Sequence, residues 1–131
     1  MSKDEPTPEE TMRRGRRAAA QEIFDVIAEG HLDRPEVTRG AMFGSNGLRW
    51  GGRLLAFLGG DGELIVKLPA EHAAGLVADG QATAVRVGRN PAREWVAVPA
   101  PDALEHADTW RELISAARRY AAAQPRPTGR S

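Results

Sequence analysis

The sequence predicts an α+β fold, a two-layer sandwich in which a mostly antiparallel sheet carries its helices on one face. Two observations support this prediction. Helical periodicity occurs in three separate stretches, and short apolar runs divided by glycine-bearing spacers lie between them. The resulting order is a helix, three or four strands, a helix, two strands and a helix. Short glycine-bearing spacers are typical of hairpins, so we expect most neighbouring strands to run antiparallel.

The first helix is predicted to begin at Pro8 and to end at Gly30. Thr7 is a suitable capping residue, Pro8 fits the first helical position, and Glu10 stands where a capping box requires an acid. A glycine after the last turn is a common helix terminator. One face of this helix should be buried, because apolar residues follow helical spacing. These residues are Ala20, Ile23, Phe24 and Ile27.

The centre of the chain is predicted to form a meander of short strands. Residues 37–42 suit a strand, and a turn signal precedes them at residues 33–35. The glycine pair at residues 51–52 is expected to form a tight hairpin, and residues 59–62 should form a second turn. The apolar runs that predict the remaining strands of the meander cover residues 48–50, 54–58 and 64–68.

The glycine-rich stretch at residues 40–53 raises the question of a phosphate-binding loop. Its glycines match neither the G-x-G-x-x-G nor the Walker pattern. The run that follows predicts a strand, whereas a phosphate loop needs a helix N-terminus there. We therefore interpret residues 44–47 as a turn between two strands, since glycine and asparagine tolerate a positive φ.

The second half of the chain is predicted to hold two helices and two strands. A helix should open at Pro69 and stop at residues 79–80, where an aspartate and a glycine stand. Two strands are expected over residues 83–87 and 94–98, with a loop between them. Asp102 is predicted to cap the last helix. The buried stripe of that helix should be Trp110, Leu113, Ile114, Ala117 and Ala121.

We expect a single domain over residues 7–123, with a disordered stretch at 1–6 and a flexible tail at 124–131. The 131 residues include 18 basic and 18 acidic side chains, so the chain lacks the global charge of a strongly basic nucleic-acid binder. The absence of cysteine excludes disulfides and thiolate chemistry. No apolar run approaches the ~20 residues of a membrane span, and the N-terminus is polar, so we predict a cytoplasmic protein without membrane contact.

A short signature in the glycine-rich stretch resembles that of the TfoX/Sxy N-terminal domain family. It is Arg39-x-x-Met42-Phe43-Gly44-x-x-Gly47-Leu48. Its companions, in the family's order, are Gly51, Phe57, the Leu64-x-x-Lys67-Leu68 strand, and Trp95 with Pro99. The resemblance covers roughly residues 15–122. It implies a secretion-chaperone-like α+β fold, similar to the YjbR-like architecture, and a domain without enzymatic activity.

Residues that commonly bind metals or carry catalysis do not form recognisable motifs in this sequence. His31, His72 and His106 are scattered without the close spacing of metal ligands, so we predict no metal site and no cofactor. Ser45 lacks the glycine two positions earlier that a nucleophile elbow requires. We therefore predict that the protein is not an enzyme.

The function predicted from the sequence is a protein-interaction or regulatory module with an unknown protein partner. The runs at residues 54–58 and 64–66 are apolar at consecutive positions, which indicates that both faces of the sheet are covered. Three helices would achieve this, or a second copy of the chain in a homodimer. The residues that we assign to such an interaction are Arg39, Met42, Phe43, Trp50, Lys67 and Trp95.

An alternative function is accessory binding of nucleic acid through the first helix. Its basic cluster would contact phosphates, and each neutralised phosphate would steepen the salt dependence of binding. Glu9 and Glu10 offset this positive charge, so a solvated helix face is the favoured interpretation. The basic cluster consists of Arg13, Arg14, Arg16 and Arg17.

A third class of function is an enzyme or a domain that binds a small ligand. It would need a pocket near Met42, Lys67 and Trp95. Arg39 and Lys67 would then hold an anion in that pocket, although no sequence rule requires this arrangement.

Overall fold

The computed structural model describes residues 5, 7–42, 45–87 and 90–124, and the side chains of residues 5, 7–40, 47–86 and 92–124. Its helices are α1 (Pro8–Glu29), α2 (Ala70–Ala78) and α3 (Asp108–Ala123), with a 3-10 helix, η1 (Leu104–His106), before α3. Its strands are β1 (Val37–Met42), β2 (Ser45–Trp50), β3 (Arg53–Leu58), β4 (Leu64–Lys67), β5 (Thr83–Val87) and β6 (Asn90–Val98).

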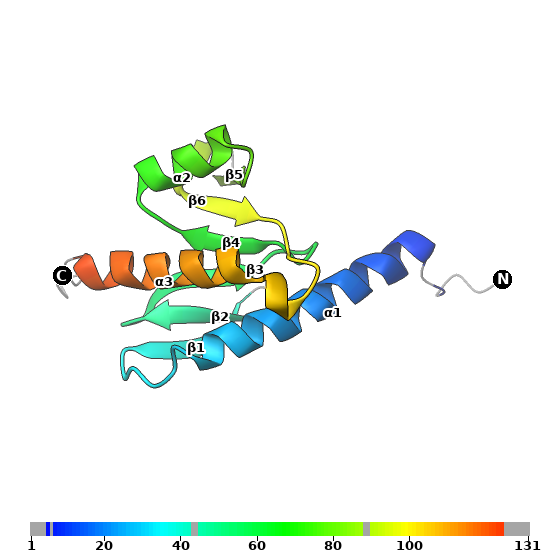
Figure 1. The fold of residues 1–131 in the computed structure, drawn as a ribbon, viewed down its shortest axis with the longest axis horizontal. Helices are drawn as coiled ribbons and strands as arrows, with labels where there is room; N and C mark the ends of the chain where they lie inside the picture. Colours follow the sequence, from blue (N-terminus) through cyan, green and yellow to red (C-terminus); the bar gives the residue numbers. More distant parts are fainter. Residues whose placement is uncertain (1–4, 6, 43–44, 88–89, 125–131) are drawn as a thin grey trace.

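One sheet runs through the molecule in the order β1-β2-β3-β4-β6-β5. Each pair of neighbours in the described sheet is antiparallel. The connection through α2 passes over β6 and places β5 at the outer edge. All three helices lie on the same face of the sheet (Figure 1). The predicted two-layer α+β sandwich is therefore confirmed.

The first helix begins and ends where the sequence predicts. Thr7 caps it, because its Oγ1 accepts a hydrogen bond of 3.1 Å from the backbone N–H of Glu10. Gly30 follows the last turn as the C-cap. The predicted stripe is buried, and Phe24 within it is fully enclosed. The N-terminal half of α1 extends beyond the sheet, as Figure 1 shows.

A row of apolar side chains crosses four strands beneath the helices. Its members stand opposite one another in successive strand pairs, and all of them are buried. We call it the central row, and it consists of Leu48, Ala56, Val66 and Val96. The stripe of α3 joins it in one hydrophobic core. Within that stripe, Trp110 is 1% exposed, and its Nε1 donates to the carbonyl oxygen of Pro99 at 3.0 Å.

A β-bulge explains why two consecutive residues of β3, Leu55 and Ala56, lie on the same face of the sheet. The pairing of β2 with β3 shifts between Leu48 and Arg49, so β3 has one extra residue there. Leu55 and Ala56 are both buried as a result. The helices cover one face of the sheet, whereas the sequence indicated that both faces would be covered. Coverage of the other face by a second copy stays a prediction.

The glycines of residues 44–47 do not form the predicted turn within the described residues. β2 already begins at Ser45, and Gly44 lies outside the described residues. Gly47 is required for a different reason, because a Cβ there would lie 3.0 Å from the carbonyl oxygen of Ala56. This glycine therefore allows β2 to pack closely on β3.

The last helix and the last strand begin at other residues than predicted. α3 starts at Asp108 with Ala107 as its N-cap, after η1. Asp102 does not cap α3, because its Oδ1 instead contacts Nδ1 of His106 at 2.6 Å. The buried stripe predicted for this helix is confirmed. β6 begins at Asn90, within the predicted loop.

The remaining boundaries agree with the sequence or lie outside the described residues. α2 and β5 occupy the predicted positions. The hairpin at residues 51–52 is confirmed, since its two glycines have φ values of 54° and 86°. The predicted disordered stretch 1–6 and the predicted tail 124–131 lie outside the described residues, apart from Glu5 and Gln124.

Gly62 is the point where the turn between β3 and β4 touches α1. Its φ is +86°, and a Cβ there would lie 3.1 Å from Cβ of Ala20 and 3.3 Å from the carbonyl oxygen of Arg16. We expect Gly62→Ala to lower the free energy of unfolding by about 2–4 kcal/mol, because backbone strain and overpacking add to each other. Urea denaturation measures this change.

Gly80→Ala is the matched control for this substitution. Gly80 also has a positive φ, +76°, but nothing lies within 4 Å of a Cβ placed there. We therefore expect only the backbone cost, about 1–2 kcal/mol. Equal losses of stability in the two variants would contradict a packing role for Gly62 against α1.

Candidate interaction surface

The sheet face opposite the helices, here called the open face, holds an apolar strip. Side chains alternate along a strand, so the neighbours of the buried central row project from the open face. Phe57 stands opposite Ile65, and the rings of Phe57 and Trp95 meet edge to face with their centroids 6.0 Å apart. The described, partly exposed side chains that define the open face are Arg49, Leu54, Phe57, Ile65, Lys67, Trp95 and Ala97.

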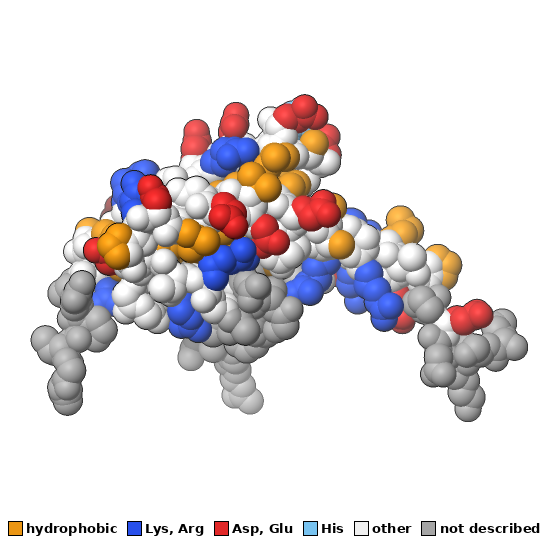
Figure 2. Space-filling model, turned by 90° about the horizontal axis from the view of Figure 1, so that it is seen from below, with side chains coloured by type: hydrophobic (Ala, Val, Ile, Leu, Met, Phe, Trp, Pro, Cys, Tyr) orange, Lys and Arg blue, Asp and Glu red, His pale blue; other side chains and the backbone are white. Residues whose placement is uncertain are grey.

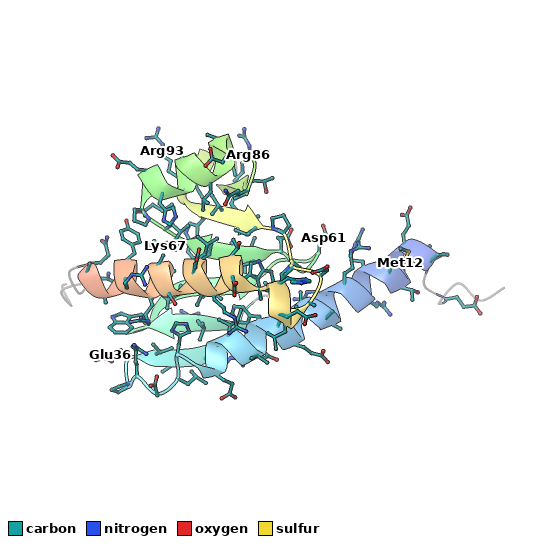
Figure 3. All side chains as sticks on the ribbon, viewed as in Figure 1. Met12, Glu36, Asp61, Lys67, Arg86 and Arg93 are labelled. Atoms are coloured by element: carbon teal, nitrogen blue, oxygen red, sulfur yellow. The ribbon has the colours of Figure 1, made fainter. Side chains whose placement is uncertain are left out.

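Cationic side chains border the apolar strip. Lys67 stands opposite Trp95 in the pairing of β4 with β6. Arg93, two residues before Trp95, is exposed and lies toward the outer edge beside α2 (Figure 3). On the β2 side, Nη1 of Arg49 donates to the carbonyl oxygen of Gly52 at 3.1 Å. The open face thus combines aromatic and aliphatic side chains with positive charge.

Two carboxylates near the open face, those of Glu63 and Glu94, accept hydrogen bonds from groups other than its cations. Glu63, just before β4, accepts a hydrogen bond of 3.1 Å from the backbone N–H of Asp61. Glu94 of β6 accepts a hydrogen bond from the hydroxyl of Tyr120 and so connects the sheet to α3. This hydrogen bond, with a smaller contribution from burial, raises the pKa of Tyr120. Both carboxylates keep their negative charge, but neither forms an ion pair with Lys67 or Arg93 among the described residues.

The structure separates the residues that the sequence assigned to an interaction. Lys67 and Trp95 lie together on the open face. Arg39 and Trp50 lie on the side that the helices cover, where Arg39 contacts α1 and Trp50 packs against the core. Arg39 and Lys67 therefore do not face a common anion. The two residues whose side chains lie outside the described residues are Met42 and Phe43.

Arg39 holds β1 against α1. Its Nη2 donates to Oδ1 of Asp25 at 2.7 Å, and its guanidinium carbon lies 5.8 Å from the centroid of the Phe24 ring. Gln21 donates to the same carboxylate oxygen at 2.8 Å. The Arg39 side chain is 22% exposed, so these contacts are partly sheltered from water. Arg39 therefore has a structural role between two elements.

Trp50 lines a hollow of about 610 Å³ at one end of the sheet. Glu36 and Arg53 add charged groups to its wall, and Ala121 and Gln124 contribute from the end of α3. Figure 3 shows Glu36 at this end of the molecule. A second groove, of about 520 Å³, lies between α2 and the β5–β6 edge and is lined mainly by alanine and valine. The two hollows thus differ in polarity.

The basic cluster of α1 is divided between contacts within the chain and solvent. Nε of Arg13 lies 3.1 Å from Oδ1 of Asp61, and Nε of Arg17 donates to the carbonyl oxygen of Gly59 at 3.4 Å. Both acceptors belong to the turn between β3 and β4, beside α1 (Figure 3). Figure 2 shows basic side chains along the part of α1 that extends beyond the sheet. The other, exposed members of the cluster are Arg14 and Arg16.

The apolar strip itself was not predicted from the sequence. Phe57 and Ile65 were assigned to covered strands, because their runs are apolar at consecutive positions. In β4 the alternation could have revealed Ile65, since Lys67 two residues later is polar and shares its face. In β3 the bulge at Leu55 hides the alternation, so no local pattern identifies Phe57 as part of the open face.

The described part of the chain contains no group of three or more His, Asp or Glu side chains that could hold a metal ion. In the same ranges, no helix combines the length and the apolar character that crossing a membrane requires. The predictions made from the sequence about cofactors and location stay predictions.

These observations define an α+β domain in which the sheet face opposite the described helices is apolar and cationic. Comparison with protein-family models gives a match to the Luciferase domain over residues 52–117. The match covers half of the chain and runs from β3 into α3. The chain therefore belongs to the Luciferase domain family. Neither the curated proteins nor the solved structures that we compared with it include a match.

The resemblance to the TfoX/Sxy N-terminal domain is wrong. The family comparison identifies the Luciferase domain instead, over a region that begins after the signature at residues 39–48. One residue of that signature, Gly47, is present because β2 packs closely on β3. A requirement of this kind arises in many sheets, so it does not specify a family. The functional expectations that came only from this resemblance are withdrawn.

We expect Arg39→Met to lower the free energy of unfolding by about 1–3 kcal/mol, because Asp25 loses a charge-assisted hydrogen bond. Methionine keeps part of the contact with Phe24, which limits the loss. A double-mutant cycle with Asp25→Asn should give a coupling energy of about 1 kcal/mol. Urea denaturation supplies all four free energies. A coupling energy near zero would show that the ion pair does not hold β1 against α1.

Proposed function

We propose that this protein is a non-enzymatic interaction module that binds an acidic protein segment through the open face. The observation that carries the proposal is the strip of Phe57, Ile65 and Trp95 on the sheet face opposite the described helices. The uncovered faces of antiparallel sheets are normally polar, because they contact water. An apolar strip in that position favours a binding surface.

The charge of the open face favours an acidic partner over a second copy of the chain. Lys67 stands beside Trp95, and Arg93 is close by in β6. Two copies that met through this face would bring like charges together, which weakens association. A segment with both carboxylates and apolar side chains would complement the cations and the strip at once. The homodimer is therefore the less favoured form of the interaction.

Binding of nucleic acid is the second candidate function. The exposure of Arg14 and Arg16 on the projecting part of α1 favours it, and aromatic side chains on a sheet can stack with bases. Arg13 and Arg17 already contact the turn between β3 and β4, which leaves less of the cluster for phosphates. The zero net charge also gives no long-range attraction to a polyanion.

The name of the family suggests luciferase activity as a competing role. We retain the non-enzymatic role, because the apolar and cationic chemistry of this chain is spread over a sheet face. Such a surface suits contacts with another chain better than the enclosure of a reacting molecule. The cytoplasmic location predicted from the sequence is part of the same proposal.

A fluorescently labelled peptide that alternates leucine with glutamate tests the proposal, with the corresponding leucine and lysine peptide as its control. We expect the acidic peptide to bind in an anisotropy titration and the basic peptide not to bind. Lys67→Glu and Trp95→Ala should each weaken binding by about tenfold or more, because the first removes a charged contact with the peptide and the second removes an apolar one.

Arg119→Glu makes the same change of charge on the exposed side of α3 and should leave the peptide affinity unchanged. Circular dichroism verifies that each variant is folded. Unchanged binding of the acidic peptide to Lys67→Glu and Trp95→Ala would overturn the proposal. So would tight binding of a single-stranded oligonucleotide without binding of the peptide, or a dimer in sedimentation velocity that Trp95→Ala dissociates.

A further inference from the structure

The groove of about 520 Å³ between α2 and the strands β5 and β6 has an apolar wall. Ala74 and Val77 line it from α2, and Ala84 and Val96 line it from the two strands. We call this hollow the α2 groove. Its volume lies within the range of about 300–1,000 Å³ that is typical of ligand-binding hollows. The groove is therefore large enough to be a binding site.

Helix α2 is more apolar than its burial in the fold requires. Six of its nine residues, all of them described, are alanine, leucine or valine, but Ala73 is the one that is buried. Leu76 packs partly against the core, whereas Val77 is 38% exposed and Ala74 is exposed as well. A surface helix normally turns its apolar residues toward the core. The apolar residues of α2 that face the groove therefore indicate a surface that a partner covers.

An irregular pairing of β5 with β6 connects the α2 groove to the open face. The register shifts between Ala84 and Arg86 of β5, where β6 contains extra residues. Arg93 and Trp95 belong to this irregular part of β6, and both line the groove. Trp95 is also part of the apolar strip, because its ring meets that of Phe57. The groove thus begins where the apolar strip ends.

Two arginines and one carboxylate surround the α2 groove. Arg93 lines it, and Arg86 follows Ala84 by two residues in β5. Both arginines are exposed and lie at the end of the molecule that holds α2 (Figure 3). Glu71, in the first turn of α2, also lines the groove. The ion pairs among the described residues include none of these three side chains, so the local charge favours an anionic ligand.

We infer that the α2 groove binds aliphatic side chains of the same acidic segment that the open face binds. This inference rests on the proposed function and extends it, because the segment would pass over Trp95 from the open face into the groove. Its leucine, isoleucine or methionine side chains would replace water on the alanine and valine wall. A carboxylate next to them in the segment would meet Arg93.

A second copy of the chain fits the α2 groove less well than an acidic segment. Two grooves placed face to face would leave both concave walls without contact. Met12 is a large apolar side chain that is 61% exposed, and Figure 3 shows it on the projecting part of α1. Arg13 and Arg14 follow it directly, so this helix would bring positive charge toward Arg93.

An anisotropy titration with the leucine and glutamate peptide tests the inference. Val77→Asn should weaken binding by about tenfold, because it puts a polar amide on the apolar wall without a change of charge. Val26→Asn is the matched control. Val26 is 48% exposed in the last turn of α1 and does not line the groove, so its substitution should leave the affinity unchanged. Circular dichroism verifies that both variants are folded.

A second measurement locates the bound peptide on the unchanged protein. The methyl signals of Val77 in the NMR spectrum should shift as peptide is added and saturate at the same concentration as the anisotropy, whereas those of Val26 should stay in place. Full affinity in Val77→Asn, or no shift at Val77, would refute the inference alone if Lys67→Glu still weakens binding.

Two other outcomes would also contradict the inference. If the unchanged protein does not bind the acidic peptide at all, the proposed function fails together with the inference. A dimer in sedimentation velocity that Val77→Asn dissociates would assign the α2 groove to a second copy of the chain instead.

Discussion

The fold depends on the central row, which aligns four strands beneath three helices. Because strand register decides which face a side chain occupies, this alignment gives all three helices the same apolar surface to cover. The same register directs Phe57, Ile65 and Trp95 to the opposite face, where no described helix covers them. A slip of one residue between two strands would exchange their faces. Core and binding surface are therefore two consequences of one pairing.

Equal numbers of basic and acidic side chains, 18 of each, conceal an uneven distribution of charge. Arg13 and Arg39 meet carboxylates and connect α1 to the sheet and its turns. Lys67 instead borders an apolar strip. Near His31, burial and the positive charges of Arg118 and Arg34 lower the pKa of the imidazole, and Asp33 opposes them more weakly. Local charge thus carries functional information that the net charge of the chain does not contain.

Much of the fold could be predicted because the deciding signals are local. Thr7 and Gly30 bound α1 through capping, and the stripe of α3 follows helical spacing. Some predictions failed because the role of a residue depends on a contact with residues distant in the chain. Gly47 is fixed by the approach of β3. The predicted cap at Asp102 failed for a local reason, since its carboxylate contacts His106 four residues later. The bulge at Leu55 hid the open face.

The order of the strands divides the sheet into two locally connected parts that meet along one seam. β1 to β4 pair with their neighbours in the chain, as do β5 and β6, whereas β4 and β6 pair across the α2 connection. The amide of Leu68 lengthens this seam by donating to the carbonyl oxygen of Glu94 at 2.8 Å. A hairpin between consecutive strands closes only a short loop of chain, whereas the pairing of β4 with β6 closes the longer loop that contains α2 and β5. The pairing of β4 with β6, which joins the two locally connected parts of the sheet, should therefore limit the folding rate of the chain.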